Sequence, residues 1–222
     1  MKAKIKKKIL FTVLICAGVI SIGIITVHFS NQHLSKSELA QLRKQYPIYG
    51  PTISQELIDA FGKEAYIEQY HEKTENFIYG EIVGEHTTFW RNQYTGKEAE
   101  KSYGNNWKEL MEYTMIVSDD TNGIFEQGDE ITLVSGIGSG LVAGLPVLAE
   151  GMKVVIPVYQ DSFKESRYWW SEVGMYYVTE DGYVISAFDE ETLSYKVYSG
   201  IKVEELLEKV KVYVTFHTHA NN

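Results

Sequence analysis

The sequence predicts a mainly β-sheet domain with helical additions, of the α+β class, placed behind a single N-terminal transmembrane helix. The first eight residues contain five lysines and run directly into an uncharged, apolar stretch. Nearly all of the 16 tyrosines, 9 phenylalanines and 4 tryptophans follow this stretch, and aromatic residues favour strands. The later segments are short and separated by turn residues, without the regular strand–helix alternation of parallel α/β sheets. The outer domain is therefore expected to be a small β-barrel with one or two flanking helices.

Residues 9–29 are predicted to form a transmembrane signal-anchor helix. The uncharged part, residues 9–27, would rise about 28 Å as a helix, close to the hydrocarbon core thickness of about 30 Å. The lysines of residues 1–8 would stay in the cytoplasm, so we expect a single-pass cell-membrane protein with an extracytoplasmic C-terminal domain. The alternative is a protein secreted after signal cleavage, but signal peptides have a shorter apolar region of about 7–15 residues.

The predicted organisation has five parts. They are a cytoplasmic basic tail (1–8), the membrane span (9–29), a stalk (30–52), the extracytoplasmic domain (53–214) and a short tail (215–222). The part after the span carries 16 basic and 30 acidic residues, a net charge of −14. Such a surface excludes nucleic acid as a partner and disfavours lying flat on anionic lipid. The outer part contains no cysteine, so its core and not disulfides must hold it together.

Two helices are predicted before the first strand. Residues 35–45 form a short polar helix in which Ser35 caps the N-terminus and Glu38 completes a capping box. Residues 54–70 form a second helix, because apolar residues such as Leu57 and Phe61 recur at helical spacing.

The remaining segments predict a run of short strands. Strands are expected at residues 76–84, 110–117, 131–135, 153–159, 174–179 and 183–188. A long polar loop is expected at residues 91–106, and Pro157 indicates an edge or bulge position in its strand. The Asp181-Gly182 step is a strong hairpin signal between the last two strands. A final helix is expected at residues 203–212.

The succession of segments resembles a known class of proteins. The likeness rests on residues 77–84 (FIYGEIVG), a strand ending at Val117, residues 125–133 (FEQGDEITL) and residues 150–158 (EGMKVVIPV). It resembles membrane-anchored bacterial surface proteins whose OB-type barrel is similar to the netrin-like domain of tissue metalloproteinase inhibitors. The resemblance, over roughly residues 76–190, implies the fold. Inhibitor activity is not implied, because those inhibitors grip zinc through an N-terminal cysteine and depend on disulfides, which this outer domain lacks.

One acidic turn fits the template of a calcium loop in part. Its template positions 1, 3, 5, 6, 9 and 12 are occupied by Ser118, Asp120, Asn122, Gly123, Glu126 and Asp129. Oxygen ligands from Asp120, Asn122, Glu126 and Asp129 would suit a hard cation. Position 1 is normally Asp and position 12 Glu, and strands flank the turn instead of helices, so a solvated acidic hairpin is favoured over weak calcium binding. No cofactor is predicted.

The aromatic run Tyr168-Trp169-Trp170 is the candidate binding site. Adjacent residues of a strand point to opposite faces, so at least one of the three rings could be exposed and stack on a sugar or anchor a partner. The structural alternative is that the rings fill the core or lie near the bilayer.

Three functions remain open from the sequence. The leading one is a non-enzymatic, membrane-tethered domain that binds a protein, a peptide or an envelope glycan. The second is an accessory or immunity subunit of a membrane complex, in which the span is part of the interface. The third is a cell-envelope hydrolase that uses carboxylates, which would require a buried Asp or Glu with a shifted pKa in a cleft.

Overall fold

The described part of the chain belongs almost entirely to one compact unit. The computed structural model describes residues 33–46, 48, 74, 76–136, 148–170, 174–188, 190 and 192–218, the last seven by their backbone alone. The chain divides after His33 into two units, and the account below concerns the second, residues 34–222. The predicted span at 9–29 and the predicted helix at 54–70 lie outside the described residues. No helix within the described ranges is long and apolar enough to cross a membrane.

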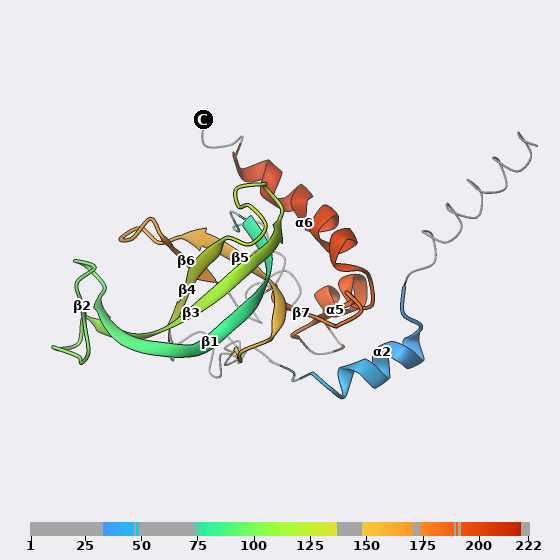
Figure 1. Ribbon diagram of the computed structural model, residues 1–222, viewed down its shortest axis with the longest axis horizontal. Coiled ribbons are helices and arrows are strands. Elements are labelled where there is room, and N and C mark those ends of the chain that lie inside the picture. Colours follow the sequence, from blue (N-terminus) through green and yellow to red (C-terminus); the bar gives the residue numbers. More distant parts are fainter. Residues whose placement is uncertain are drawn as a thin grey trace, which may run out of the picture. The chain divides into compact units, whose positions relative to one another are not determined.

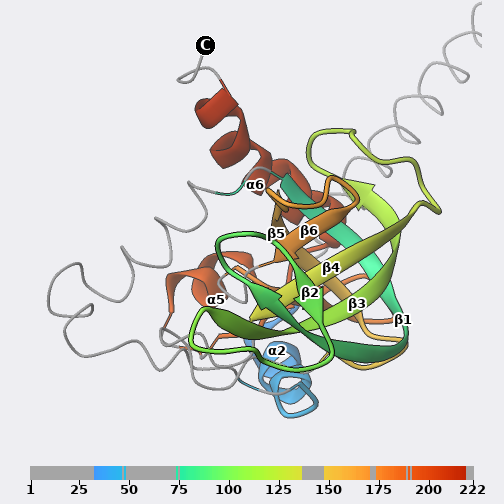
Figure 2. The ribbon, with the colours of Figure 1, turned by 90° about the vertical axis from the view of Figure 1, so that its left-hand side faces the viewer.

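The described residues form one mainly β unit with few helices, in the α+β class (Figure 1). The strands are β1 (Asn76–Asn92), β2 (Glu98–Ala99), β3 (Trp107–Asp120), β4 (Glu130–Gly136), β5 (Lys153–Gln160), β6 (Arg167–Trp170), β7 (Tyr176–Val178) and β8 (Val184–Ser186). They lie in the order β2-β1-β3-β4-β6-β5-β7-β8, and β1 also pairs with β5. This extra pairing closes β1, β3, β4, β6 and β5 into a ring (Figure 2). All pairs are antiparallel except β4 with β6.

Strand β1 bends and takes part in two regions of the sheet. Its first part pairs with both β3 and β5, and its second part pairs with β3 and β2 after register shifts at Gly80 and between Val83 and Thr87. At Gly80 a Cβ would lie 2.4 Å from the carbonyl oxygen of Ile116, so glycine permits the close approach of β1 and β3. Residues 87–112, which we call the arm, sweep away from the ring (Figure 1).

The predicted strands are confirmed, with different boundaries. The first was predicted to end at residue 84, but β1 continues to Asn92, and the predicted loop at 91–106 contains β2, which pairs with β1. Pro157 occurs in β5 where neither β6 nor β7 pairs, which suits a residue without an N–H. Strands β7 and β8 form the predicted hairpin, and Gly182 has a φ of +75° in its turn.

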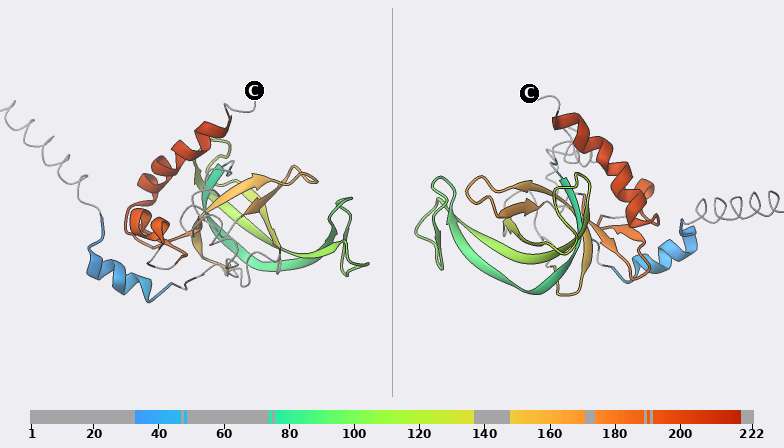
Figure 3. Two further views of the ribbon diagram at one scale, coloured as in Figure 1. Left: turned by 180° about the vertical axis from the view of Figure 1, so that it is seen from behind. Right: turned by 45° about the horizontal axis from the view of Figure 1, so that its top comes forward.

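Two apolar clusters lie on opposite faces of the strands. Adjacent residues of β1 enter different clusters: Ile78 faces the inside of the ring, and Phe77 faces the outer side. The outer cluster joins β1, β5, β7 and β8 to helix α6 (Val203–Thr218), whose Leu206 and Val210 are fully buried (Figure 3). The inner cluster includes Tyr113, which is also fully buried.

The two other described helices are short and are fixed by specific contacts. In α2 (Lys36–Arg43) the predicted capping box of Ser35 and Glu38 is confirmed. Arg43 is buried at the end of this helix, and its guanidinium donates to the carbonyl oxygens of Ser186 and Phe188 at 2.6 and 3.1 Å. Helix α5 (Leu193–Tyr198), which the sequence did not predict, follows β8.

Candidate functional site

Exposed aromatic side chains gather at one end of the ring. Tyr94 and Tyr103 on the arm are 76% and 66% exposed, and Tyr159 and Phe163 on the β5–β6 hairpin (residues 158–170) are 46% and 45% exposed. The arm and this hairpin project to the same side of the ring (Figures 1 and 3). The other exposed large hydrophobic side chains of the described residues are aliphatic and lie elsewhere: Ile48, Ile124 and Val197.

Arg91 links the arm to the β5–β6 hairpin. Its side chain is only 3% exposed, and its guanidinium donates to the Asp161 carboxylate at 2.5 Å and to Glu98 at 2.8 and 3.1 Å. The same guanidinium lies between aromatic rings, with its carbon 6.0 Å from the ring centre of Phe163 and 5.9 Å from that of Trp169. Because Asp161 is fully buried, this pair depends on hydrogen bonds and charge to offset the loss of solvation.

Glu98 of β2, which pairs with Arg91, also forms ion pairs with two cations of the β5–β6 hairpin. Lys164 and Arg167 from the hairpin donate to its carboxylate at 2.6 and 2.5 Å, and Arg167 also pairs with Glu112 of β3. Partial burial of Glu98 acts to raise its pKa, but hydrogen bonds from Lys164 and Arg91 and the charges of Arg167 and Lys164 outweigh it. The pKa of Glu98 is therefore held below its usual range, and the carboxylate stays charged at neutral pH.

The arm and the hairpin also touch through packing. Gly96 has a φ of +67°, and a Cβ there would lie 2.5 Å from the ring of Phe163. The turn that carries Tyr94 is fixed by the Asn92 side chain, whose oxygen accepts from the backbone N–H groups of Tyr94 and Thr95, both at 3.0 Å. The two loops thus present their exposed rings from a defined backbone.

The predicted aromatic run lies in β6 and alternates between two faces. Trp170 is 4% exposed and packs edge-on against Tyr113 inside the ring. Tyr168 is packed against the inner cluster, and burial raises the pKa of its hydroxyl. Trp169 points the other way and stacks nearly parallel on Tyr159, with ring centres 6.5 Å apart. Of the three, Trp169 is the ring that lies beside the Arg91 cluster.

Two of the predicted calcium residues, Asp120 and Asp129, act as hydrogen-bond acceptors at the β3–β4 turn. The carboxylate of Asp120 accepts from the side-chain amide of Asn76 at 2.7 Å and from the backbone N–H groups of Asn122 and Ile124. Asp129 accepts from the backbone N–H of Glu126. Across the described ranges, no three or more His, Cys, Asp or Glu side chains are grouped to hold a metal ion. These contacts define the turn and give no ligand set.

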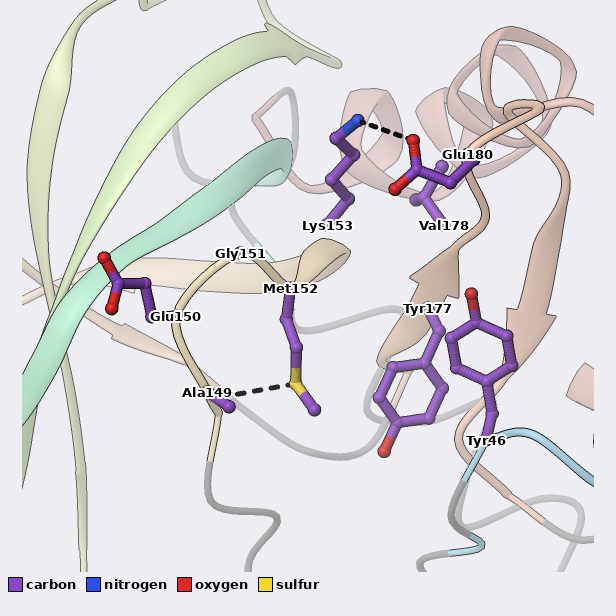
Figure 4. A pocket seen from close by; sticks show the side chains of 9 residues that line it. All are labelled: Tyr46, Ala149, Glu150, Gly151, Met152, Lys153, Tyr177, Val178 and Glu180. Carbon is purple, nitrogen blue, oxygen red and sulfur yellow. Dashed lines mark hydrogen bonds and ion pairs between the residues drawn. The ribbon is translucent and has the colours of Figure 1, made fainter.

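A separate pocket of about 320 Å³ lies beside the start of β5 and the end of β7 (Figure 4). Its lining is Tyr46, Ala149, Glu150, Gly151, Met152, Lys153, Tyr177, Val178 and Glu180. The ring centres of Tyr46 and Tyr177 lie 5.1 Å apart. The Lys153 ammonium forms an ion pair with the exposed Glu180 carboxylate, with 3.9 Å between nitrogen and oxygen. The lining contains no histidine, cysteine or serine.

The residues of the Arg91 cluster were not found from the sequence. Arg91 and Glu98 fell in a predicted loop, and nothing in the spacing of Asp161 from Arg91 indicates that they meet. The available signal was Tyr94 and Tyr103, two large rings in an otherwise polar loop.

Comparisons with known proteins give no relatives for this chain. No family model, no curated protein and no solved structure matches it. The described side chains at the arm end offer aromatic faces, amides, hydroxyls and balanced charges.

Proposed function

We propose that this chain is a non-enzymatic, membrane-tethered, extracytoplasmic binding domain. It holds a protein, a peptide or an envelope glycan at the aromatic surface formed by the arm and the β5–β6 hairpin. The observation that carries the proposal is that the exposed aromatic side chains of the described residues gather there. Tyrosine and tryptophan are enriched where binding energy concentrates, because a large ring buries much area at low entropic cost.

The scaffold we propose is an OB-type barrel. In the ring, β1, β3 and β4 form an antiparallel meander, β5 and β6 form a hairpin, β6 lies parallel to β4, and β5 pairs with β1. A five-stranded Greek-key barrel of the OB type would have this connectivity, which supports the proposed scaffold. In such barrels the loop between the first two strands and the loop between the last two flank the ligand face, and here these are the arm and the hairpin.

The Arg91 cluster supports binding by fixing the surface in advance. Ion pairs from Arg91, Lys164 and Arg167 cross between the arm and the hairpin, and Phe163 packs on Gly96. Two loops held together in this way lose little conformational freedom when a partner arrives.

The carboxylates do not favour the hydrolase interpretation. A general acid needs a pKa raised towards neutrality. The two described carboxyl groups with a resolved shift, Glu38 and Glu98, both have lowered pKa values. Asp161 is buried, but it is paired with Arg91 and accepts a hydrogen bond from the backbone N–H of Phe163.

The membrane tether is supported by the sequence. Five lysines followed by an apolar stretch of helix-spanning length are typical of a signal anchor with a cytoplasmic N-terminus. Replacing residues 9–29 by an unrelated span tests the role of this segment. Partner capture should persist, whereas its loss would favour the accessory or immunity subunit, in which the span is part of the interface.

Site-specific photo-cross-linking in intact cells tests the binding surface. A benzophenone amino acid is placed at Tyr103 or Phe163 in the full-length protein, and at Ile124 or Val197 as controls of similar exposure. We expect specific adducts from the first pair and none from the second. Equal adducts from both pairs, or none from any position, would contradict the proposed surface.

A further inference from the structure

We propose further, resting on the binding function above, that the arm binds an uncharged glycan chain. Its sugar rings would stack on Tyr94 and Tyr103, and its hydroxyl groups would bond to the amides and hydroxyls around these rings. Three properties of the arm carry this inference: the form of its exposed apolar surface, its polar side chains and its charge.

The exposed apolar surface of the arm consists of tyrosine rings in defined positions. Tyr103 is supported by Trp107, with ring centres 5.3 Å apart, and the ammonium of Lys101 lies 5.8 Å from its ring centre. Tyr94 projects from the turn that Asn92 fixes. Among the described residues of the arm no large aliphatic side chain is exposed, and a flat ring without aliphatic neighbours suits the C–H face of a sugar better than a protein core.

The polar side chains beside these rings match the chemistry of sugar hydroxyls. The exposed ones without charge are Gln93, Thr95, Ser102, Asn105 and Asn106. Amide and hydroxyl side chains both donate and accept hydrogen bonds, which a sugar hydroxyl requires of its partner. Lipid-inserting surfaces instead present aliphatic and tryptophan side chains beside a strongly basic face.

The charges of the arm are balanced, so the arm would not select a ligand by its net charge. The arm contains four basic and four acidic residues, and the β5–β6 hairpin contains two of each, within an outer part of net charge −14. An anionic polymer or anionic lipid would meet no net attraction here and repulsion from the rest of the domain. Arginine is one of the residue types that often anchor protein interfaces. The arginines of the arm and the hairpin, Arg91 and Arg167, have side chains that are only 3% and 14% exposed, and both are engaged in ion pairs.

A peptide that adds a strand to the sheet is also disfavoured. The outer edge of β8 is occupied, since Val184 exchanges hydrogen bonds with Gly200 and Ile201 at 2.7 and 2.9 Å. At the other end of the sheet, β2 has two residues, which is too short to template a strand.

The test measures binding of defined probes to the full-length protein in detergent micelles by calorimetry. The probes are chitohexaose and cellohexaose as uncharged chains with and without N-acetyl groups, a galacturonate hexamer as the anionic chain, and vesicles containing phosphatidylglycerol. We expect one of the two uncharged chains to bind, and which of them binds identifies the sugar class. Tyr103→Ala and Tyr94→Ala should each weaken this binding about tenfold, the worth of one aromatic stack. Tyr103→Phe should retain most of it, and Ile124→Ala, at similar exposure in another turn, should have no effect.

Other results overturn the inference. Preferential binding of the galacturonate chain would assign recognition to charge, and binding of the vesicles would assign the arm to a lipid surface. Absence of binding by every probe would also overturn it. If photo-cross-linking from Tyr103 still yields a specific protein adduct in that case, the glycan is wrong and the binding surface stands; if it does not, both proposals fail.

Discussion

At one end of β1 Phe77 is buried among apolar side chains beneath α6, whereas at the other end Arg91 is buried among carboxylates and aromatic rings. Both side chains are removed from water, but the first needs no specific partner and the second needs two. Apolar contacts tolerate small displacements, because they lack direction. A buried ion pair with poor geometry becomes a cost, because the desolvation of its charges is no longer offset.

The difference indicates two roles for the two ends. The end beneath α6 provides stability that depends little on salt or pH. The arm end gains little net stability from its ion pairs, because in a buried pair the attraction roughly balances the cost of desolvation. The ion pairs instead hold the arm and the β5–β6 hairpin in a single defined arrangement. We therefore expect the arm end, where some of the ion pairs reach solvent, to be the part of the molecule whose stability responds to salt and acid.

The largest effect is expected from Arg91→Met. The substitution leaves the Asp161 carboxylate buried without its cation, which typically costs about 3–5 kcal/mol. Urea denaturation of the full chain in micelles, followed by tryptophan fluorescence, measures the loss. Adding Asp161→Asn should recover part of it. Lys209→Met, which breaks an exposed pair with Glu205, is the control and should cost less than about 1 kcal/mol. A loss no larger than that control would show that the buried pair is not needed.

Leu206→Ala tests the apolar end. Leu206 is fully buried in the cluster beneath α6, and deleting such a side chain costs about 2–5 kcal/mol. The loss should be the same in 0.1 and 1 M salt, whereas the loss caused by Lys164→Met, which breaks a partly exposed ion pair with Glu98, should be smaller in 1 M salt. Equal salt dependence of the two variants would remove the distinction between the ends.

Gly96→Ala tests the packing between the loops. It places a methyl group against the Phe163 ring in a left-handed backbone, at an expected cost of about 1–3 kcal/mol. Gly123→Ala is the matched control, because Gly123 has a similar φ of +62° but no atom within 4 Å of the added Cβ. The excess loss in Gly96→Ala measures the Phe163 contact, and a difference of zero would mean that the loops do not depend on it.

The smallest effect is expected from Glu98→Gln and appears in the pH dependence. Because the folded pKa of Glu98 is lowered, its ion pairs stabilise the protein above the unfolded pKa near 4.5 and this stability is lost as the pH falls through the folded pKa. The variant should be less stable than the parent at pH 7 by up to about 1 kcal/mol, and the gap should close as the pH is lowered through the folded pKa of Glu98. Denaturation curves at pH 7 and pH 3 measure this, and a gap that widens in acid would contradict the assignment.

A strand could be predicted from the sequence where its side chains are buried and therefore apolar. A strand that forms only through backbone pairing with its neighbour could not be predicted. The start of β1 was predictable from residues 77–83, which are β-rich and largely buried. Its continuation to Asn92 was not, because His86 and its neighbours are exposed and carry no apolar pattern. Glu98 and Ala99 have little strand propensity and form β2 through pairing with Trp90 and Arg91.

The candidate site, too, was only partly predictable from the sequence. Alternation along a strand correctly indicated that Trp169 and Trp170 point to different faces, because this follows from strand geometry alone. The meeting of Arg91 with Asp161 depends on the curvature of β1 and on ring closure, neither of which leaves a mark in residue spacing. A single sequence therefore indicated the half-buried Trp169 beside the Arg91 cluster and missed the cluster itself.

The pairing of β1 with β5 has a consequence for the order of folding. One of its pairs, Phe77 with Pro157, joins positions about 80 residues apart, whereas β3 and β4 are joined by a short turn. Closing a long loop costs chain entropy before any contact repays it, so we expect the β1–β3–β4 meander to form first and the ring to close late. Until it closes, one edge of β1 remains open and can pair with a strand of another chain, so the interval before closure is when the protein is most exposed to aggregation.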